Sequence, residues 1–80
     1  MYLSKQEKDV VCIFSQATNP MDAHNKMQDY FNRNEKEIHA CTKSLYEKGF
    51  ISCAPVPRQG QHYTALKITA INKEMCDRYC

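Results

Sequence analysis

The sequence predicts one small α+β domain that is mostly helical: three helices, then a two-stranded hairpin and a short C-terminal helix. Three observations predict this order. Helix-capping signals stand before apolar patterns of helical period. After Gly49 the pattern changes from helical to alternating, and prolines with a glycine separate the two alternating runs. Eighty residues are enough for one such domain, which we assign to residues 1–80.

The first helix is predicted over about residues 5–17. Ser4 and Glu7 have the spacing of a capping box, in which a hydroxyl and a carboxylate each accept a backbone N–H of the first turn. Val10, Val11 and Phe14 then recur at helical spacing and predict a buried face.

Two further helices are predicted over about residues 20–31 and 35–48. Asn19 suits the N-cap of the first, and Pro20 suits its first turn. Asn34 caps the next helix, whose inner side consists of Ile38, Cys41 and Leu45 at spacings of three and four. Gly49 ends that helix because glycine tolerates the left-handed backbone of a helix C-terminus.

The alternating runs predict strands at about residues 50–54 and 63–68. Two prolines stop the first strand, and Gly60 supplies a turn within an extended polar tip at residues 55–62. We expect Thr69 to cap a last helix over about residues 70–79, with Ile71, Met75 and Tyr79 on its inner side.

The stretch Leu45-Tyr46-Glu47-Lys48-Gly49-Phe50-Ile51 resembles the end of the recognition helix in MarR-like and related small transcriptional regulators. Leu66-Lys67-Ile68-Thr69 resembles their second wing strand. The span 26–51 keeps a helix-turn-helix register, with Asn32 at the turn position where glycine is usual. The resemblance implies a winged helix-turn-helix fold, a three-helix bundle with a two-stranded β-wing.

That resemblance implies a sequence-specific regulator of transcription that binds double-stranded DNA. Helix 35–48 would enter the major groove and the tip at 55–62 would lie on the flanking groove. The expected DNA-binding residues are Asn34, Lys36, His39, Ala40, Lys43, Arg58, Gln59 and Gln61. Such regulators commonly dimerise, so we also expect a homodimer, with Met75 and Tyr79 as its interface.

Charge favours this function only in part. The net charge is +2, but residues 33–68 hold six basic residues against three acidic ones, for a net +3. A positive segment favours a polyanionic partner. Glu35 and Glu37, at the start of the same helix, oppose phosphate binding. They favour the alternative, a winged-helix protein-protein interaction module within a larger transcription or chromosome-maintenance assembly.

The five cysteines form no Cys-x-x-Cys pair, and their number is odd. Cys12 and Cys41 fall on apolar helix faces, which predicts buried free thiols and a reducing, cytoplasmic setting. The N-terminus has no apolar secretory segment, and no apolar run has the length of a bilayer span. Cys76 and Cys80 lie four apart, a spacing that leaves a metal or redox role open. No nucleophile motif or phosphate loop predicts an enzyme, a cofactor or a structural metal.

Overall fold

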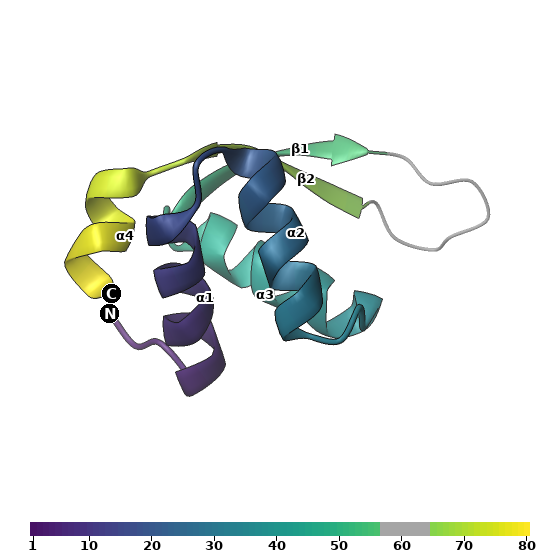
Figure 1. Cartoon of the computed structure of the whole chain (residues 1–80), viewed down its shortest axis with the longest axis horizontal. Helices are drawn as coiled ribbons and strands as arrows, with labels where there is room; N and C mark the ends of the chain where they lie inside the picture. Colours follow the sequence, from purple (N-terminus) through teal and green to yellow (C-terminus); the bar gives the residue numbers. More distant parts are fainter. Residues whose placement is uncertain (57–64) are drawn as a thin grey trace.

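The computed structural model describes residues 1–56 and 65–80 of the chain. Its elements are α1 (Lys5–Gln16), α2 (Pro20–Tyr30), α3 (Glu35–Glu47), β1 (Ile51–Val56), β2 (Ala65–Ile71) and α4 (Lys73–Tyr79). In Figure 1, α4 lies at one end of the molecule and the hairpin extends towards the other, with α1, α2 and α3 between them. The predicted mostly helical α+β domain and its element order are confirmed. The layout is compatible with a winged helix.

Helix α1 begins with the predicted capping box. The backbone N–H of Glu7 donates to Ser4 Oγ at 3.1 Å, and the N–H of Ser4 donates to Glu7 Oε1 at 3.1 Å. These two bonds satisfy backbone donors that a helix N-terminus leaves without intrahelical partners. Val10, Val11 and Phe14 are fully buried, as their spacing predicts.

Helix α2 begins at the predicted cap and ends in a turn with two left-handed residues. The N–H of Asp22 donates to Asn19 Oδ1 at 2.8 Å. Beyond the helix, Asn32 has φ 53° and Arg33 has φ 60°. Their N–H groups bond to the carbonyls of Asp29 (3.1 Å) and Gln28 (2.8 Å), which forms a Schellman motif. The left-handed Asn32 agrees with its predicted turn position, whereas Arg33 was not expected to share that conformation.

Helix α3 also has the predicted cap and end. The N–H of Glu37 donates to Asn34 Oδ1 at 3.2 Å. At the other end Gly49 has φ 89°, and the N–H of Phe50 bonds to the carbonyl of Leu45 at 3.0 Å. This second Schellman motif turns the chain sharply, so that the fully buried Phe50 leads directly into β1.

Both strands end later in the chain than predicted, β1 at Val56 and β2 at Ile71. β1 and β2 pair antiparallel from Ile51↔Ile71 to Val56↔Ala65, with an irregularity between Ser52 and Cys53. The prediction that Pro55 ends the first strand was wrong. Among the described residues β1 pairs with β2 alone, so a proline without an N–H is tolerated on its other edge.

The predicted start of the last helix was also wrong. Thr69 lies within β2, and Asn72 caps α4 instead, its Oδ1 accepting the N–H of Met75 at 3.2 Å. Ile71 packs against the core from the strand, opposite Ile51, rather than from a helix. Its apolar contact is therefore retained, while the helix starts at Lys73.

The core lies between the three helices and the inner face of the hairpin. Its largest fully buried side chains are those of Phe14, Phe50, Met27, Leu45, Val10, Val11 and Cys76. Cys41 is buried and free, as predicted, and Cys76 is buried with its thiol donating to the Phe50 carbonyl at 3.7 Å. Burial raises the pKa of the Cys41 thiol to about 12.

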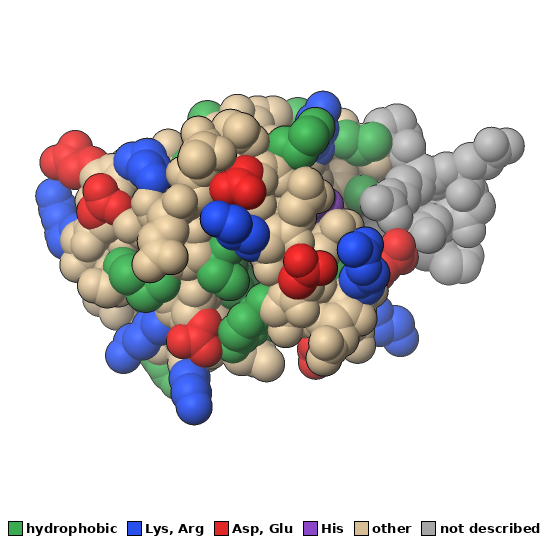
Figure 2. Space-filling view, viewed as in Figure 1, with side chains coloured by type: hydrophobic (Ala, Val, Ile, Leu, Met, Phe, Trp, Pro, Cys, Tyr) green, Lys and Arg blue, Asp and Glu red, His purple; other side chains and the backbone are tan. Residues whose placement is uncertain are grey.

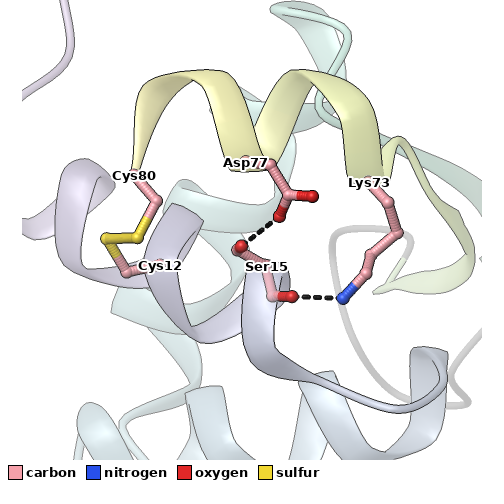
Figure 3. The surroundings of a disulfide bond; sticks show 5 residues. All are labelled: Cys12, Ser15, Lys73, Asp77 and Cys80. Carbon is pink, nitrogen blue, oxygen red and sulfur yellow. Dashed lines mark hydrogen bonds between the residues drawn. A yellow bond between two sulfur atoms is a disulfide. The ribbon is translucent and has the colours of Figure 1, made fainter.

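Cys12 is not a free thiol. It forms a disulfide with Cys80, with the two Cα atoms 4.8 Å apart (Figure 3). Cys12 is only half-buried, and it lies on the side of α1 that faces the end of α4. The prediction of a buried free thiol at Cys12 was therefore wrong, and the reducing cytoplasm inferred from it loses that support.

Candidate nucleic-acid interface

The side of α3 that faces away from the core is uncovered. At 3.6 residues per turn, positions 36, 40, 43 and 47 fall on one face of a helix. Lys36, Ala40, Lys43 and Glu47 are all exposed. His39 is half-buried at the edge of this face. We call Lys36, His39, Ala40, Lys43 and Glu47 the outer face of α3.

The structure therefore brings together four of the predicted site residues on one surface. Asn34 is exposed just before them, but its side-chain Oδ1 accepts the N–H of Glu37 and so caps the helix. Only the amide nitrogen of Asn34 is left for an outside contact. Asn34 is thus primarily a residue that defines where α3 begins.

The two lysines of the outer face have no acidic partner in the described chain. Among residues 1–56 and 65–80, neither Lys36 nor Lys43 forms an ion pair. Seven residues separate them, which corresponds to about 10.5 Å along the helix axis. Two uncompensated ammonium groups at that spacing are available to an anionic partner.

Acidic residues limit the positive potential of the same surface. Glu35 and Glu37 are exposed in the first turn of α3, and Glu47 lies at its last turn. Acidic groups in a first turn stabilise the helix through its dipole. In the described residues the outer face is therefore of mixed charge and is not a continuous positive stripe.

Lys48 is withdrawn from that surface by a contact with α1. Its ammonium lies 2.6 Å from Glu7 Oε2 and 3.1 Å from the carbonyl of Tyr2. Ser44 Oγ donates to the same carboxylate oxygen at 2.7 Å. We call Glu7, Ser44 and Lys48 the α1–α3 clamp. One of the basic residues that make the segment 33–68 positive is thus neutralised inside the molecule.

The clamp perturbs the carboxyl group strongly. Burial by itself raises the pKa of Glu7, but the hydrogen bonds from Lys48, Ser44 and the Ser4 backbone outweigh it and lower that pKa to about 2. Glu7 therefore stays ionised down to strongly acidic pH and holds α3 in a fixed position relative to α1. The Ser-x-x-Glu spacing revealed its capping role, but no local signal indicated its second role, 37 and 41 residues away along the chain.

Charge on the surface around α2 is balanced. On the face drawn in Figure 2, side chains of both signs lie interspersed. On α2, Lys26 pairs with Asp22 at 3.2 Å and Arg33, just beyond the helix, lies 3.8 Å from Asp29. A surface of this kind offers no single-sign field to a polyanion. The outer face of α3 remains the better candidate.

No family model, curated protein or solved structure matches this chain. A function must therefore be argued from the arrangement of its own residues.

The predicted contacts of the hairpin tip, Arg58, Gln59 and Gln61, lie outside the described residues. The two paired strands are described, and an apolar groove of about 630 Å³ runs between the start of α2 and β2. Asn19, Pro20, Met21 and His24 line one side, and Val56 with residues 65–69 line the other. The groove was not predicted, because it joins two segments more than thirty residues apart.

The two residues expected at a dimer interface differ in exposure. Met75 is half-buried and packs against the core of its own chain. The ring of Tyr79 lies edge-on to that of Phe50, with centroids 5.5 Å apart, and keeps 38% of its surface exposed. The homodimer stays a prediction. Of the two residues, Tyr79 has the exposed surface that an interface would need.

The cysteine pair of α4 is not arranged for a metal. Cys80 is bonded to Cys12, and Cys76 is buried. In the part of the chain that the structure describes, no three His, Cys, Asp or Glu side chains are grouped to hold a metal ion. Nor is any helix of that part both long and apolar enough to cross a membrane.

Proposed function

We propose that this protein is a sequence-specific regulator of transcription that binds double-stranded DNA, with α3 in the major groove and the hairpin tip on the flanking groove. The observation that carries the proposal is the pair Lys36 and Lys43, exposed and without ion pairs among the described residues, on the uncovered face of α3. The major groove of B-DNA is about 12 Å wide and admits a helix.

The way in which α3 is held supports this role. A reading helix needs one fixed orientation, and α3 is fixed at both ends by caps and on its inner side by the core and the α1–α3 clamp. These contacts use Ser44, Leu45 and Lys48, none of which belongs to the outer face. Lys36, Ala40 and Lys43 can therefore meet DNA while the contacts of Ser44, Leu45 and Lys48 that hold the fold stay in place.

The residue types of the outer face suit base edges and phosphates. Lys36 and Lys43 can bind guanine edges or phosphate oxygens, His39 can donate to either, and Ala40 can contact a thymine methyl group. Glu35 and Glu37 lower the affinity for any duplex. Binding by a single copy is then expected to be weak and to depend only modestly on salt.

Fluorescence anisotropy with labelled duplexes selected from a random pool, read at two salt concentrations, tests the proposal. We expect Lys43→Ala and Arg58→Ala each to weaken binding by roughly 1 kcal/mol or more while the domain stays folded. Arg78→Ala is the matched control, because Arg78 is paired with Glu74 on α4. The proposal fails if the parent binds no duplex, or if all three variants bind like the parent at low salt.

A second candidate is a protein-interaction module of a larger transcription or chromosome-maintenance assembly. The groove beside the hairpin favours it, because Met21 at its rim is 71% exposed and Val56 is 38% exposed. Exposed apolar side chains around a groove are typical of sites that bind protein partners. Met21→Ser would then abolish partner binding and leave DNA binding unchanged.

A further inference from the structure

Helix α4 is fastened to α1 at three levels. Lys73 donates to the carbonyls of Ser15 and Ala17 at the end of α1, the latter at 3.2 Å. Ser15 Oγ donates to Asp77, and Cys80 is bonded to Cys12. Figure 3 shows the contacts of Ser15 with Lys73 and Asp77 along one side of α4, and the disulfide at the end of that helix. The two helices therefore run antiparallel. Of these three contacts, the disulfide is the covalent one.

A helix as short as α4 depends on these attachments. It has seven residues, and isolated helices below about 12 residues are marginal in water. Its first turn has the Asn72 cap, and the buried Cys76 anchors its middle. The last turn, with Asp77, Tyr79 and Cys80 exposed, has the disulfide as its strongest attachment.

The five cysteines differ in access to solvent. Cys80 is exposed and Cys12 half-buried, so their bond can be reached by a small thiol. Cys41 and Cys76 are buried, and burial raises their pKa values to about 12 and about 11. Burial also raises the pKa of Cys53. The remaining thiols are thus protonated near neutral pH and do not attack the disulfide from within.

The last turn of α4 also covers the junction between α3 and β1. Tyr79 packs edge-on against Phe50, the residue that links the two elements. The carbonyl of Phe50 accepts the N–H of Asn72 at 2.9 Å and the thiol of Cys76. The position of α4 is therefore coupled to the end of α3.

We propose that the Cys12–Cys80 disulfide is a reversible redox latch that fastens the last turn of α4 to α1. This inference does not depend on DNA binding. The latch is closed when the two thiols are oxidised and open when they are reduced. When it is open, the last turn frays and Tyr79 leaves Phe50, while the contacts of Lys73 keep the first turn in place.

The latch opens by thiol–disulfide exchange in two steps, with glutathione as the reducing thiol. A glutathione thiolate attacks the Sγ of Cys80, the more exposed residue of the pair, which breaks the S–S bond and releases the Cys12 thiolate. A second glutathione thiolate attacks the mixed disulfide, releases the Cys80 thiolate and leaves oxidised glutathione. Two electrons pass to the protein, and the two thiolates take up protons from water. Closing the latch reverses both steps, with oxidised glutathione as the oxidant.

The test equilibrates the whole chain in glutathione buffers of graded ratio, approached from the oxidised and from the reduced protein. Samples are then acid-quenched, unfolded and alkylated for intact mass. We expect two species, one with three alkylated thiols (Cys41, Cys53 and Cys76) and one with all five. The same curve is expected from both directions. Cys53→Ser is the matched control and should give the same midpoint with one thiol fewer.

Hydrogen exchange of the two end states then tests the coupling to α4. On reduction we expect amides 77–80 to exchange at least about tenfold faster, and those of α2 to stay unchanged. Cys80→Ser should match the reduced parent in every buffer. A thiol count that never changes with the buffer overturns the latch, as does equal protection of α4 in the two states.

Discussion

Helices α3 and α4 are both capped by an asparagine, whose Oδ1 accepts a first-turn backbone N–H at 3.2 Å in each helix. They nevertheless use their charged residues differently. On α4, Lys73 and Asp77 are bound to α1. On α3, Lys36 and Lys43 form no ion pair among the described residues, and Lys48 at the C-cap is the lysine bound to Glu7. Charged residues that contact a neighbouring helix hold the fold, whereas those on the outer face of α3 are available to a partner.

The largest expected effect comes from breaking the inner side of α3. Leu45 is fully buried, so Leu45→Ala should cost about 2–5 kcal/mol of the free energy of unfolding. In a domain of this size that loss can unfold the chain. Urea denaturation followed by circular dichroism measures it.

The neighbouring Tyr46 supplies the control. It is 45% exposed, and Tyr46→Ala should change the free energy of unfolding by less than about 0.5 kcal/mol. Equal losses in the two variants would mean that α3 is not held by the side assigned to the core.

The α1–α3 clamp predicts a specific dependence on pH. The pKa of Glu7 falls from 4.5 to about 2 on folding, so its contribution is complete above about pH 5 and is lost as the pH falls towards 2. At about 1.36 kcal/mol per pKa unit, that contribution is about 3 kcal/mol. Glu7→Gln should lower stability at pH 7 and match the parent at pH 2. Thermal unfolding at a series of pH values measures the difference.

Glu74→Gln is the control for this titration. Glu74 is exposed on α4 and paired with the exposed Arg78, so its loss should leave the dependence of unfolding on pH nearly as in the parent. If the difference in stability between the parent and Glu7→Gln stays the same from pH 7 to pH 2, Glu7 is not ionised in the clamp.

The features predicted correctly from the sequence are those that depend on nearby residues. The caps at Ser4, Asn19 and Asn34, and the left-handed Asn32 and Gly49, all follow from side chains within a few positions. The buried faces of the three helices follow from periodicity.

The features that were missed join distant residues or depend on a choice between two nearby signals. The disulfide joins Cys12 to Cys80 across 68 positions, and periodicity alone made Cys12 a core thiol. At the start of α4, Thr69 and Asn72 are both acceptable caps. The pairing of Ile71 with Ile51 extends the strand past Thr69, so the helix begins after Asn72, which becomes its N-cap. All the predicted DNA contacts remain predictions: the structure groups those on α3 on one exposed face, whereas Arg58, Gln59 and Gln61 lie outside the described residues.

The smallest expected effect concerns the acidic residues beside the outer face. Glu37→Gln removes a negative charge near the expected phosphates and should tighten duplex binding by roughly 0.2–1 kcal/mol. It should also cost about 0.3–1 kcal/mol of stability, because Glu37 lies in the first turn of α3. Anisotropy and thermal unfolding of the same variant separate the two effects. Weaker duplex binding would mean that Glu37 makes a favourable contact with the partner.

The salt dependence of duplex binding, compared between the parent and the Lys36→Ala/Lys43→Ala double variant, tests the account most directly. If both ammonium groups lie against phosphates, the slope of log K against log salt should become shallower by about 2 units, while the unfolding curves stay alike. An unchanged slope in a folded double variant would contradict the assignment of the outer face of α3 to DNA.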